Sequence, residues 1–446
     1  MLRVNSKEVN PGDTFLALQG IEDDGHNYIE EAIDKGAACI IASQGEYSVK
    51  TITVNDTRTY LSNYLKELYI EKLDKIRLIG ISGTRGKTTT GDLIYQLLNN
   101  LGSKTAYIGT NGFYMNDEVK KISSTTPDIY EIYLLINKAI ENECENIIIE
   151  VSSKAITQRH VEGLRFDMVI FTNFIVDGLN EEEIQTYLNT KIELFKMIKK
   201  NGTAIINSKD PYYQNFALPQ NNNVFYGSKD SDYQISNIGL TYDFTEFDIN
   251  EIHVEIPLLG SYNIYNYLAA YVTAKNLHFP DEAIANAQEK LKQVDGRYQG
   301  IKYNDSLIII DYAYDKNQIE SIIKCTREFA KGRIITLIGS GGEVRENQRS
   351  QIGKMVTKKS DYAIFTTDNP RHEEPEDIID EMTKEIQNDN YEVIVNRKEA
   401  IKHGINMLEN YDILLVLGKG HEETQIIGSD EFPFKDYNEV IKNLKR

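Results

Sequence analysis

The stretch IRLIGISGTRGKTTT, residues 76–90, constrains the fold of this chain more than any other. An apolar run stops at a glycine turn, and a helical pattern follows with apolar residues at Leu93, Ile94, Leu97, Leu98 and Leu101. Strand, glycine turn and helix in this order predict a phosphate-binding loop, because the helix N-terminus presents backbone N–H groups to an anion. The usual pattern places a glycine where this chain has Ile81, so the motif is approximated by the flanking Gly80 and Gly83.

Three side chains of this region have predicted chemical roles. Lys87 supplies a cation for the outer phosphates, and the Thr88 hydroxyl can reach a magnesium ion beside them. Glu150 ends the strand-like run NIIIE, where a carboxylate is placed to hold the same ion. The loop predicts ATP or another nucleotide as a ligand, and its predicted binding positions are Gly83, Thr84, Arg85, Gly86, Lys87, Thr88 and Thr89.

Length and composition limit the number of domains and the kinds of partner. The 446 residues predict two to four domains, and the net charge of −19 repels nucleic acid and acidic membrane surfaces. The three cysteines lie far apart and form no CxxC pair, which is typical of reduced thiols in a cytosolic protein. MLRVNSKEV contains no apolar signal region, and no stretch has the length of a membrane span. We therefore expect a cytoplasmic monomer that acts on small molecules.

Alternating strand-like and helix-like segments predict an α/β fold of three domains. We expect a small N-terminal α/β domain over residues 1–74, with a helix at YIEEAIDKGA and a strand at CIIA. Residues 75–297 are expected to form a central phosphate-loop ATPase whose mostly parallel sheet contains NIIIE, FDMVIFTNF and TAIIN. Residues 298–446 are expected to form a C-terminal Rossmann-like, doubly wound domain.

The C-terminal part contains five apolar runs, and four of them end in a polar or glycine cluster. These clusters are Asp311, residues 339–342, Asp368 with Asn369, and residues 418–420. Ligands of open α/β sheets bind beyond the carboxyl ends of the strands. We therefore expect the four clusters to line one cleft.

Motifs along the whole chain follow the order of one known family. They are PGDTFLAL and DGHNYIEEAIDKGA near the start; GTRGKTTT, STTPD, EVSS, VEGLRFDMVIFTN and YLNTKIELF in the centre; and VDGR, DYA, GSGGE, TDNPRHEEP and GKGHEETQI towards the end. In these motifs the sequence resembles the Mur ligases of cell-wall precursor synthesis, most closely the MurE type. The resemblance extends over essentially the entire chain.

The resemblance implies a first domain for the UDP end of a UDP-muramoyl dipeptide, a central ATPase, and a mobile third domain for an incoming diamino acid. It also implies a reaction of peptidoglycan precursor synthesis, in which ATP phosphorylates the dipeptide carboxylate and an amine then attacks the acyl phosphate to form an amide. A carboxylate cannot expel oxide, so it must first acquire a leaving group. Lys87 with magnesium would offset the charge that accumulates.

Family roles carry over to individual positions of this sequence. Ser6 and His26 match residues near the uridine, and Lys191 matches a lysine whose carbamylated form binds a second magnesium ion. The positions that match residues around the adenine, phosphates and ribose of ATP are Asn266, Arg297 and Asp311. The positions that match the contacts to the muramoyl peptide are Thr125, Thr126, Ser152, Gln158 and His160.

The motif DNPR, residues 368–371, is expected to bind the incoming amino acid. A forked guanidinium suits a carboxylate at the far end of that substrate, and family members with DNPR generally take meso-diaminopimelate rather than lysine. The positions that match this pocket are Arg349, Asp368, Asn369, Pro370, Arg371, Gly418 and Glu422.

Several positions depart from the family pattern. The first histidine of the family's DHLDYH, which helps to bind the second magnesium ion, is Gly178 here. The family's SSH ends in Lys154, and its DYAH ends in Tyr314. Its Q-x-R ends in His160, and Ser124 replaces an asparagine before the threonine pair. The changes cluster around the metal and the phosphates, while the amino-acid pocket is unchanged.

Three interpretations of these changes stay open. In the first, Lys154 replaces a metal ion with a fixed positive charge, which weakens the case for carbamylation of Lys191. In the second, catalysis is slow or lost, and the chain is a binding protein that senses or sequesters the same ligands. In the third, the chain is a ligase for another acyl substrate in a secondary pathway. Our principal prediction is an ATP-dependent ligase, because the chain retains Lys87, Thr88, Glu150 and Lys191.

Overall fold

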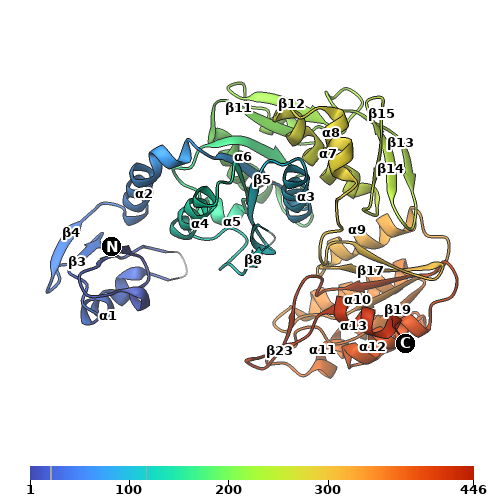
Figure 1. Cartoon of the computed structure of the whole chain (residues 1–446). Helices are drawn as coiled ribbons and strands as arrows, with labels where there is room; N and C mark the ends of the chain where they lie inside the picture. Colours follow the sequence, from blue (N-terminus) through green and yellow to red (C-terminus); the bar gives the residue numbers. More distant parts are fainter. Residues whose placement is uncertain (21–22, 117, 446) are drawn as a thin grey trace. The chain divides into compact units, whose positions relative to one another are not determined.

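The computed structural model of the chain describes residues 1–20, 23–116 and 118–445. Two compact units divide the chain, Met1–Tyr226 and Gly227–Arg446. Figure 1 draws the first unit in blue to green and the second in green-yellow to red. The division falls inside the range predicted for the central domain, and the three predicted domain ranges stay predictions.

The first unit begins with a small parallel sheet beside a helix, which agrees with the α/β class predicted for the chain. Its strands run in the order β1-β2-β3-β4. Phe15 and Ile40 pack in its core together with Ile29, the first residue of α1 (Ile29–Asp34). The remaining elements are β1 (Leu2–Arg3), η1 (Ser6–Glu8), β2 (Thr14–Leu16), η2 (Gly25–Tyr28), β3 (Cys39–Ala42), β4 (Lys50–Thr53) and α2 (Thr57–Leu73).

An eight-stranded sheet forms the centre of the first unit. Its order is β12-β11-β10-β5-β9-β6-β7-β8, and the strands from β12 to β6 are parallel, which confirms the mostly parallel prediction. The strands are β5 (Arg77–Ser82), β6 (Thr105–Gly109), β7 (Gly112–Met115), β8 (Glu118–Lys120), β9 (Asn146–Glu150), β10 (Phe166–Phe171), β11 (Ile198–Asn207) and β12 (Asn222–Tyr226). The helices are α3 (Lys87–Asn100), α4 (Ile129–Glu141), α5 (Ser153–Thr157) and α6 (Glu181–Lys196), with η3 at Tyr213–Phe216.

The second unit begins with a three-stranded antiparallel sheet that the sequence pattern did not predict. Its strands are β13 (Ile235–Leu240), β14 (Thr245–Ile249) and β15 (Ile252–Ile256). In β14 the side chains of Thr245, Phe247 and Ile249 are buried, and those between them are partly exposed. Helix α7 (Ser261–Asn276) packs against β14, and α8 (Asp281–Gln288) follows it.

The C-terminal sheet is doubly wound, as predicted. Its order is β16-β17-β21-β18-β19-β20, and only β16 is antiparallel to its neighbour among these strands. One core contains side chains of α9, α10 and α11, and a second core contains those of α12 and α13, so the helices cover both faces. The strands are β16 (Gln299–Tyr303), β17 (Ser306–Asp311), β18 (Ile334–Ile338), β19 (Tyr362–Phe365), β20 (Tyr391–Val393) and β21 (Ile413–Leu417). The helices are α9 (Lys316–Arg327), α10 (Glu346–Lys359), α11 (Pro375–Thr383), α12 (Arg397–Asn406) and α13 (Asp436–Leu444). A hairpin of β22 (Thr424–Ile427) and β23 (Asp430–Pro433) precedes α13.

Two properties expected from the composition can be compared with the described part of the chain. Cys39, Cys144 and Cys325 are buried free thiols. Among the helices of residues 1–20, 23–116 and 118–445, none combines the length and the apolar character needed to cross a membrane.

A buried ion pair joins α12 to the start of α13. The guanidinium of Arg397 donates from Nε and Nη2 to the two carboxylate oxygens of Asp436, at 2.8 and 2.7 Å. The two side chains are 1% and 0% exposed. Replacing Arg397 with Leu should lower the free energy of unfolding in urea by about 3–5 kcal/mol, because it leaves a carboxylate buried without its cation.

An exposed pair provides the matched control for this prediction. Arg327 contacts Asp361 at 2.8 Å, with side chains 42% and 41% exposed. Arg327→Leu should cost less than about 1 kcal/mol, because water screens an exposed pair. Equal losses in the two variants would show that burial does not determine the contribution of the Arg397 pair.

Candidate active site

The phosphate loop adopts the backbone that its glycines permit. Gly86 caps α3 at the N-terminus with φ of +80°, and Gly83 has φ of +151°. A Cβ atom at Gly83 would lie 1.9 Å from the Thr172 hydroxyl oxygen. Asn173 holds the loop, since its side-chain oxygen accepts from the Arg85 N–H at 2.9 Å and its carbonyl from the Thr84 N–H at 2.9 Å. The predicted strand, loop and helix are therefore present as β5, residues 83–86 and α3.

Two lysines converge on one carbonyl of this loop. Lys87 Nζ donates to the carbonyl oxygens of Gly83 and Thr84, at 3.0 and 3.1 Å. Lys191 Nζ, from α6, donates to the same Gly83 oxygen at 2.9 Å and lies 4.5 Å from the ring centroid of Tyr187. Lys191 is only 1% exposed, and this burial lowers its pKa to about 7. A substantial fraction of its amine is therefore neutral near pH 7 and able to act as a nucleophile.

Glu150 lies at the end of β9 with no solvent exposure. One carboxylate oxygen accepts from the Thr88 hydroxyl at 3.1 Å, which brings the two predicted metal ligands together. The other accepts from the Thr110 N–H at 3.0 Å and from the Tyr107 hydroxyl. Tyr107 is fully buried, and burial followed by the adjacent Glu150 raises its pKa well above the ordinary value, so it remains a donor.

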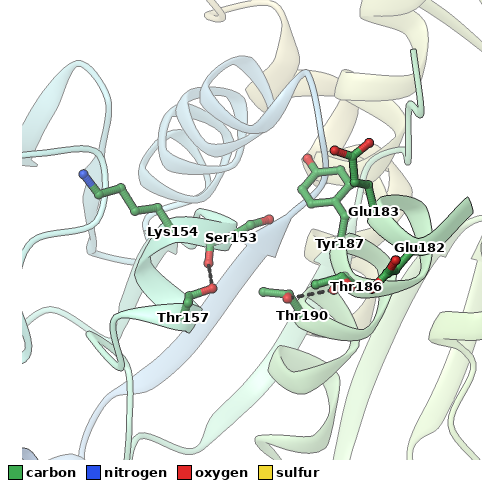
Figure 2. A pocket seen from close by; sticks show the side chains of 8 residues that line it. All are labelled: Ser153, Lys154, Thr157, Glu182, Glu183, Thr186, Tyr187 and Thr190. Carbon is green, nitrogen blue, oxygen red and sulfur yellow. Dashed lines mark hydrogen bonds between the residues drawn. The ribbon is translucent and has the colours of Figure 1, made fainter. Parts of the chain in front are cut away.

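A pocket of about 380 Å³ lies between α5 and α6, next to the phosphate loop (Figure 2). Tyr187 connects the two features, because its hydroxyl lies 3.3 Å from that of Thr84. Lys154 extends from α5 away from the α6 side chains drawn with it. The pocket is lined by Ser153, Lys154, Thr157, Glu182, Glu183, Thr186, Tyr187 and Thr190.

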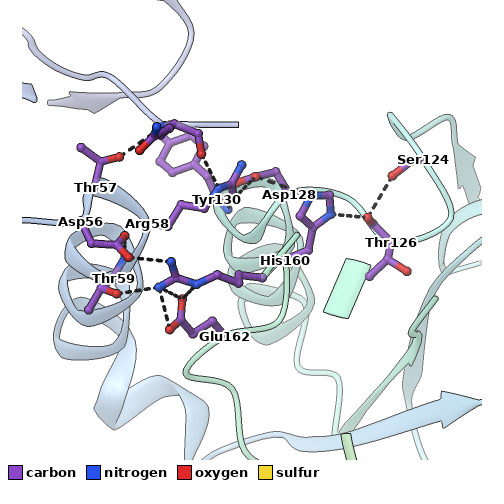
Figure 3. Close-up of polar contacts among 12 residues, drawn as sticks. Asp56, Thr57, Arg58, Thr59, Ser124, Thr126, Asp128, Tyr130, His160 and Glu162 are labelled. Carbon is purple, nitrogen blue, oxygen red and sulfur yellow. Dashed lines mark hydrogen bonds and ion pairs between the residues drawn. The ribbon is translucent and has the colours of Figure 1, made fainter. Parts of the chain in front are cut away.

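Two of the predicted peptide-binding residues, Thr126 and His160, are drawn in Figure 3, and Thr126 contacts the last residue of β9. The Thr126 hydroxyl donates to the Glu150 carbonyl at 2.8 Å and accepts from the Ser152 N–H at 3.1 Å. His160 Nδ1 lies 2.9 Å from the Thr126 carbonyl. The Thr125 hydroxyl lies 3.1 Å from that of Thr110. Gln158 follows α5 as its C-terminal cap.

The two predicted uridine residues flank α1 in the N-terminal sheet region. The Ser6 hydroxyl is buried and donates to Glu31 at 2.7 Å. His26 Nδ1 lies 2.6 Å from the Asp24 carboxylate, and its Nε2 accepts from the Ser43 N–H at 3.0 Å. Both side chains are thus oriented by neighbours within this region.

The side chains near the phosphate loop differ in how well they fit a first and a second magnesium ion. Magnesium is commonly held by one or two carboxylates together with substrate phosphates and water, so Thr88 and Glu150 beside the phosphate loop fit one ion. A second ion fits the residues less well, because Gly178 offers no ligand. A Cβ at Gly178, where φ is +78°, would have no atom within 4 Å, so crowding does not explain the glycine. Among the residues that the structure describes, no three His, Cys, Asp or Glu side chains are grouped as a metal site.

The predicted adenine, phosphate and ribose residues all lie in the second unit. Asp311, buried at the end of β17, accepts from the N–H groups of Tyr298 at 2.7 Å and Ala313 at 2.8 Å. Burial raises the pKa of Asp311, and the nearby Arg297 lowers it to a smaller extent. The Arg297 guanidinium lies 4.9 Å from the ring centroid of Tyr312. Asn266 is buried in α7 and donates to Asn263 at 2.9 Å.

The predicted amino-acid residues form a polar cluster at the carboxyl ends of β21 and β19. Lys419 Nζ is buried and donates to Asn369 at 2.9 Å and to Glu422 at 2.8 Å. The Asn369 amide donates to the same Glu422 oxygen at 2.9 Å. A Cβ at Gly418 would lie 2.4 Å from an oxygen of Asp368, which explains the glycine. Pro370 and Arg371 follow, and Arg371 is exposed with φ of +55°.

Arg349 does not present a free guanidinium to this cluster. Its side chain is 2% exposed, and Nη1 donates to Glu373 and to Glu381, each at 2.7 Å. Its Nη2 donates to the Gly341 carbonyl at 3.0 Å. In this conformation Arg349 orients the loop after β18 and the glutamates that follow DNPR.

Three residues that the sequence did not indicate, Tyr107, Thr110 and Glu373, belong to these sites, together with Lys419 of the predicted cluster at residues 418–420. Tyr107 and Thr110 hold Glu150, Lys419 holds Asn369 and Glu422, and Glu373 holds Arg349. Lys419 and Glu373 lie inside motifs that were recognised, GKGHEETQI and TDNPRHEEP. Tyr107 carried no such signal, because a tyrosine within an apolar strand is typical of a core position.

Family comparisons cover all three parts of the chain. The family description "Mur ligase family, catalytic domain" matches residues 1–74, "Mur ligase middle domain" matches 81–274, and "Mur ligase, glutamate ligase domain" matches 296–420. The chain belongs to the Mur ligase family. As a Mur ligase it is an ATP-dependent ligase, and the nucleotide predicted from its phosphate loop is ATP.

Relatives of this Mur ligase match it over nearly its full length. A UDP-N-acetylmuramoyl-L-alanyl-D-glutamate–2,6-diaminopimelate ligase of Clostridium acetobutylicum is 34% identical over 459 residues, which cover 99% of this chain and 95% of that protein. The ligase of the same name from Aquifex aeolicus is 33% identical and covers 99% and 93%. These matches confirm the resemblance to the MurE type.

Solved structures show the same fold. The structure of a UDP-N-acetylmuramoyl-L-alanyl-D-glutamate–2,6-diaminopimelate ligase matches 100% of this Mur ligase and 94% of its own chain, with a TM-score of 0.72 and 24% identity. MurF ligase from Thermotoga maritima, solved in complex with ADP, matches 94% of each chain with a TM-score of 0.66 and 20% identity.

The buried amine of Lys191 should make the stability of this Mur ligase depend on pH. Its pKa is about 7 when folded and has the ordinary value of 10.5 when unfolded. Between these values the unfolded state binds more protons, so the free energy of unfolding rises with pH. Relative to Lys191→Met, the wild type should gain about 2 kcal/mol between pH 7 and pH 9.

Urea unfolding in bicarbonate-free buffer at the two pH values measures this difference. Lys196→Met is the matched control, because Lys196 lies on the same helix with its side chain 54% exposed. This control should retain the wild-type dependence on pH. A Lys191→Met variant with an unchanged pH dependence would contradict the neutral state of the buried amine.

Proposed function

We propose that this Mur ligase adds meso-diaminopimelate, or a similar diamino acid, to the D-glutamyl carboxylate of UDP-N-acetylmuramoyl-L-alanyl-D-glutamate in peptidoglycan precursor synthesis. The observation that carries the proposal is the group formed by Lys87, Thr88 and Glu150 at the phosphate loop, because phosphoryl transfer depends on the charges of Lys87 and Glu150 and on the metal ligands Thr88 and Glu150. The names of the relatives at 33–34% identity support the substrates. The retained DNPR motif supports the amino acid.

The proposed reaction has two steps. In the first, a carboxylate oxygen of the dipeptide attacks the γ-phosphorus of ATP, an acyl phosphate forms and ADP leaves. The loop N–H groups and Lys87 hold the phosphates in place, and magnesium bound at Thr88 and Glu150 would neutralise charge on the transferring group. In the second, the amine attacks the acyl carbon, and phosphate leaves with the bonding electron pair. The amine loses a proton, and the amide is complete.

The polar cluster after β19 and β21 is proposed to bind the diamino acid. Arg371 is exposed and offers a guanidinium fork for the distal carboxylate. Glu422 offers negative charge for an ammonium group of the substrate, and the buried Asp368, whose pKa burial raises, offers carboxyl oxygens. Lys419 and Asn369 hold Glu422 in place through bonds of 2.8 and 2.9 Å.

Finer features of the proposal rest on the family resemblance and on single residues. We propose that Lys191 is carbamylated, which its low pKa supports, because only a neutral amine adds to carbon dioxide. We also propose a cytoplasmic monomer with domains over residues 1–74, 75–297 and 298–446. Magnesium is proposed as the cation.

A second candidate function is a protein that binds the same ligands with little catalysis. Gly178 favours it, because glycine removes a ligand that the family uses for its second metal ion. Phosphate release from ATP distinguishes the two functions, with UDP-muramoyl dipeptide and meso-diaminopimelate each present or omitted. Release that requires both substrates, together with a tripeptide product of the right mass, would establish the ligase. Tight binding by calorimetry without release would favour the binding protein.

Glu150→Gln isolates the role of the buried carboxylate. The variant keeps an oxygen for the Thr88 hydroxyl but loses the negative charge, so phosphate release should fall at least about 100-fold. The magnesium concentration for half-maximal activity should rise as well. Glu145→Gln is the control, because this residue directly precedes β9 with its side chain 53% exposed. Equal activity of the two variants would remove Glu150 from the metal site.

A further inference from the structure

Two helices of the first unit begin with an aspartate, and each aspartate is paired with an arginine from a different segment of the chain. Asp56 caps α2 by accepting from the Thr59 N–H at 2.9 Å, and Asp128 caps α4 by accepting from the Tyr130 N–H at 3.3 Å. Arg58 of α2 donates to Asp128 at 3.0 Å. Arg159, which follows α5, donates to Asp56 at 2.6 Å. Figure 3 draws these contacts as two separate groups, one around Asp56 and one around Asp128.

The Arg58 side chain has contacts on two sides. Its Nε donates to the Gln19 carbonyl at 2.9 Å, while Nη1 bonds Asp128. The Gln19 N–H in turn donates to the Thr57 hydroxyl at 3.2 Å. Gln19 and Asp24 form an isolated β-bridge. The Arg58 side chain is only 16% exposed, so its geometry is held more tightly than that of a surface pair.

Each side of Arg58 leads to one end of the proposed nucleotide-sugar site. On the first side, the Asp24 carboxylate accepts from the His26 N–H and lies 2.6 Å from its ring Nδ1. On the other side, Asp128 lies 3.9 Å from His160 Nε2, and His160 Nδ1 contacts the Thr126 carbonyl. The predicted uridine residue and a predicted peptide-binding residue are therefore joined by a continuous chain of contacts through Arg58.

Arg159 also contacts the start of α2, through Asp56 and Thr59. Its Nη2 donates to the Thr59 hydroxyl at 2.6 Å, and its Nε donates to Glu162 at 2.8 Å. The backbone of Arg159 has φ of +63°, a region that side-chain-bearing residues rarely occupy. The extended network of contacts holds this residue in that conformation.

We propose that Arg58 and Arg159 are positioning residues that set the distance and orientation between the uridine end and the peptide end of the UDP-muramoyl dipeptide site. This inference rests on the proposed function. A ligand that spans both ends binds well only if the two half-sites are spaced to match it, since the second contact is then intramolecular. A ligand that occupies one end does not depend on the spacing.

The test compares ligands of different length on the full-length protein. Calorimetry measures the affinity of the wild type, Arg58→Gln and Arg159→Gln for UDP and for UDP-N-acetylmuramoyl-L-alanyl-D-glutamate. Arg58→Gln should weaken binding of the spanning ligand about tenfold while changing the affinity for UDP by less than about twofold. Its KM for this substrate should rise by a similar factor, with the KM for ATP unchanged and kcat reduced less than about threefold.

Two further variants separate positioning from general damage. Arg58→Lys keeps the charge but loses the fork that reaches Gln19 and Asp128 together, so its affinity for the spanning ligand should be intermediate. Arg77→Gln is the control, because Arg77 contacts Glu145 at 3.7 Å with both side chains about half exposed, and it should bind both ligands as the wild type does.

The outcomes distinguish the inference from the proposed function. Equal losses for UDP and for the spanning ligand in Arg58→Gln, or no loss for either, would overturn the positioning role while leaving the ligase intact. A wild-type protein that binds neither ligand would refute the proposed substrate, and the inference would fall with it.

Discussion

Glu150 is the last residue of a fully buried strand, and neighbouring segments of the site donate hydrogen bonds to its carboxylate. A buried carboxylate is costly unless hydrogen bonds or a cation compensate it. Thr88 from the phosphate loop and the Thr110 N–H after β6 donate to its two oxygens, and Tyr107 adds a third donor. Its main-chain carbonyl accepts from the hydroxyl of Thr126, a predicted peptide-binding residue. Glu150 therefore links three segments by hydrogen bonds, and its carboxylate can bind a cation.

Two lysines place positive charge at the same phosphate loop. Lys87 and Lys191 both donate to the Gly83 carbonyl, so two amino groups share one oxygen. Two full charges this close would repel each other, and the burial that lowers the pKa of Lys191 to about 7 relieves this repulsion. Carbamylation would go further and set an anion beside the Lys87 ammonium. The geometry thus suits a modification that the sequence alone indicates only by resemblance.

The sequence predicts those parts of the site that follow from strand order. Parallel strands end at the same edge of a sheet, so the clusters after β17, β18, β19 and β21 had to lie together once the strands were recognised. The antiparallel sheet β13–β15 was missed, because apolar and polar residues alternate only briefly around Phe247 and the neighbouring sequence is polar. The engagement of Arg349 by Glu373 and Glu381 was also missed, since ion pairs between distant segments leave no local pattern. Local periodicity specifies elements, whereas partners across elements depend on tertiary packing.

The departures from the family pattern acquire different meanings once their surroundings are known. His160 Nδ1 lies 2.9 Å from the carbonyl of Thr126, a predicted peptide-binding residue, and its Nε2 lies 3.9 Å from Asp128. Lys154 lines the pocket between α5 and α6 and extends away from the α6 side chains drawn with it in Figure 2. Gly178 is the change that removes a ligand outright. Magnesium can be held largely by phosphates with one carboxylate, and Thr88 and Glu150 fit one such ion by their chemistry. Of these changes, Gly178 is the one that bears on the second ion, while the charges of Lys87 and Glu150 that phosphoryl transfer uses remain.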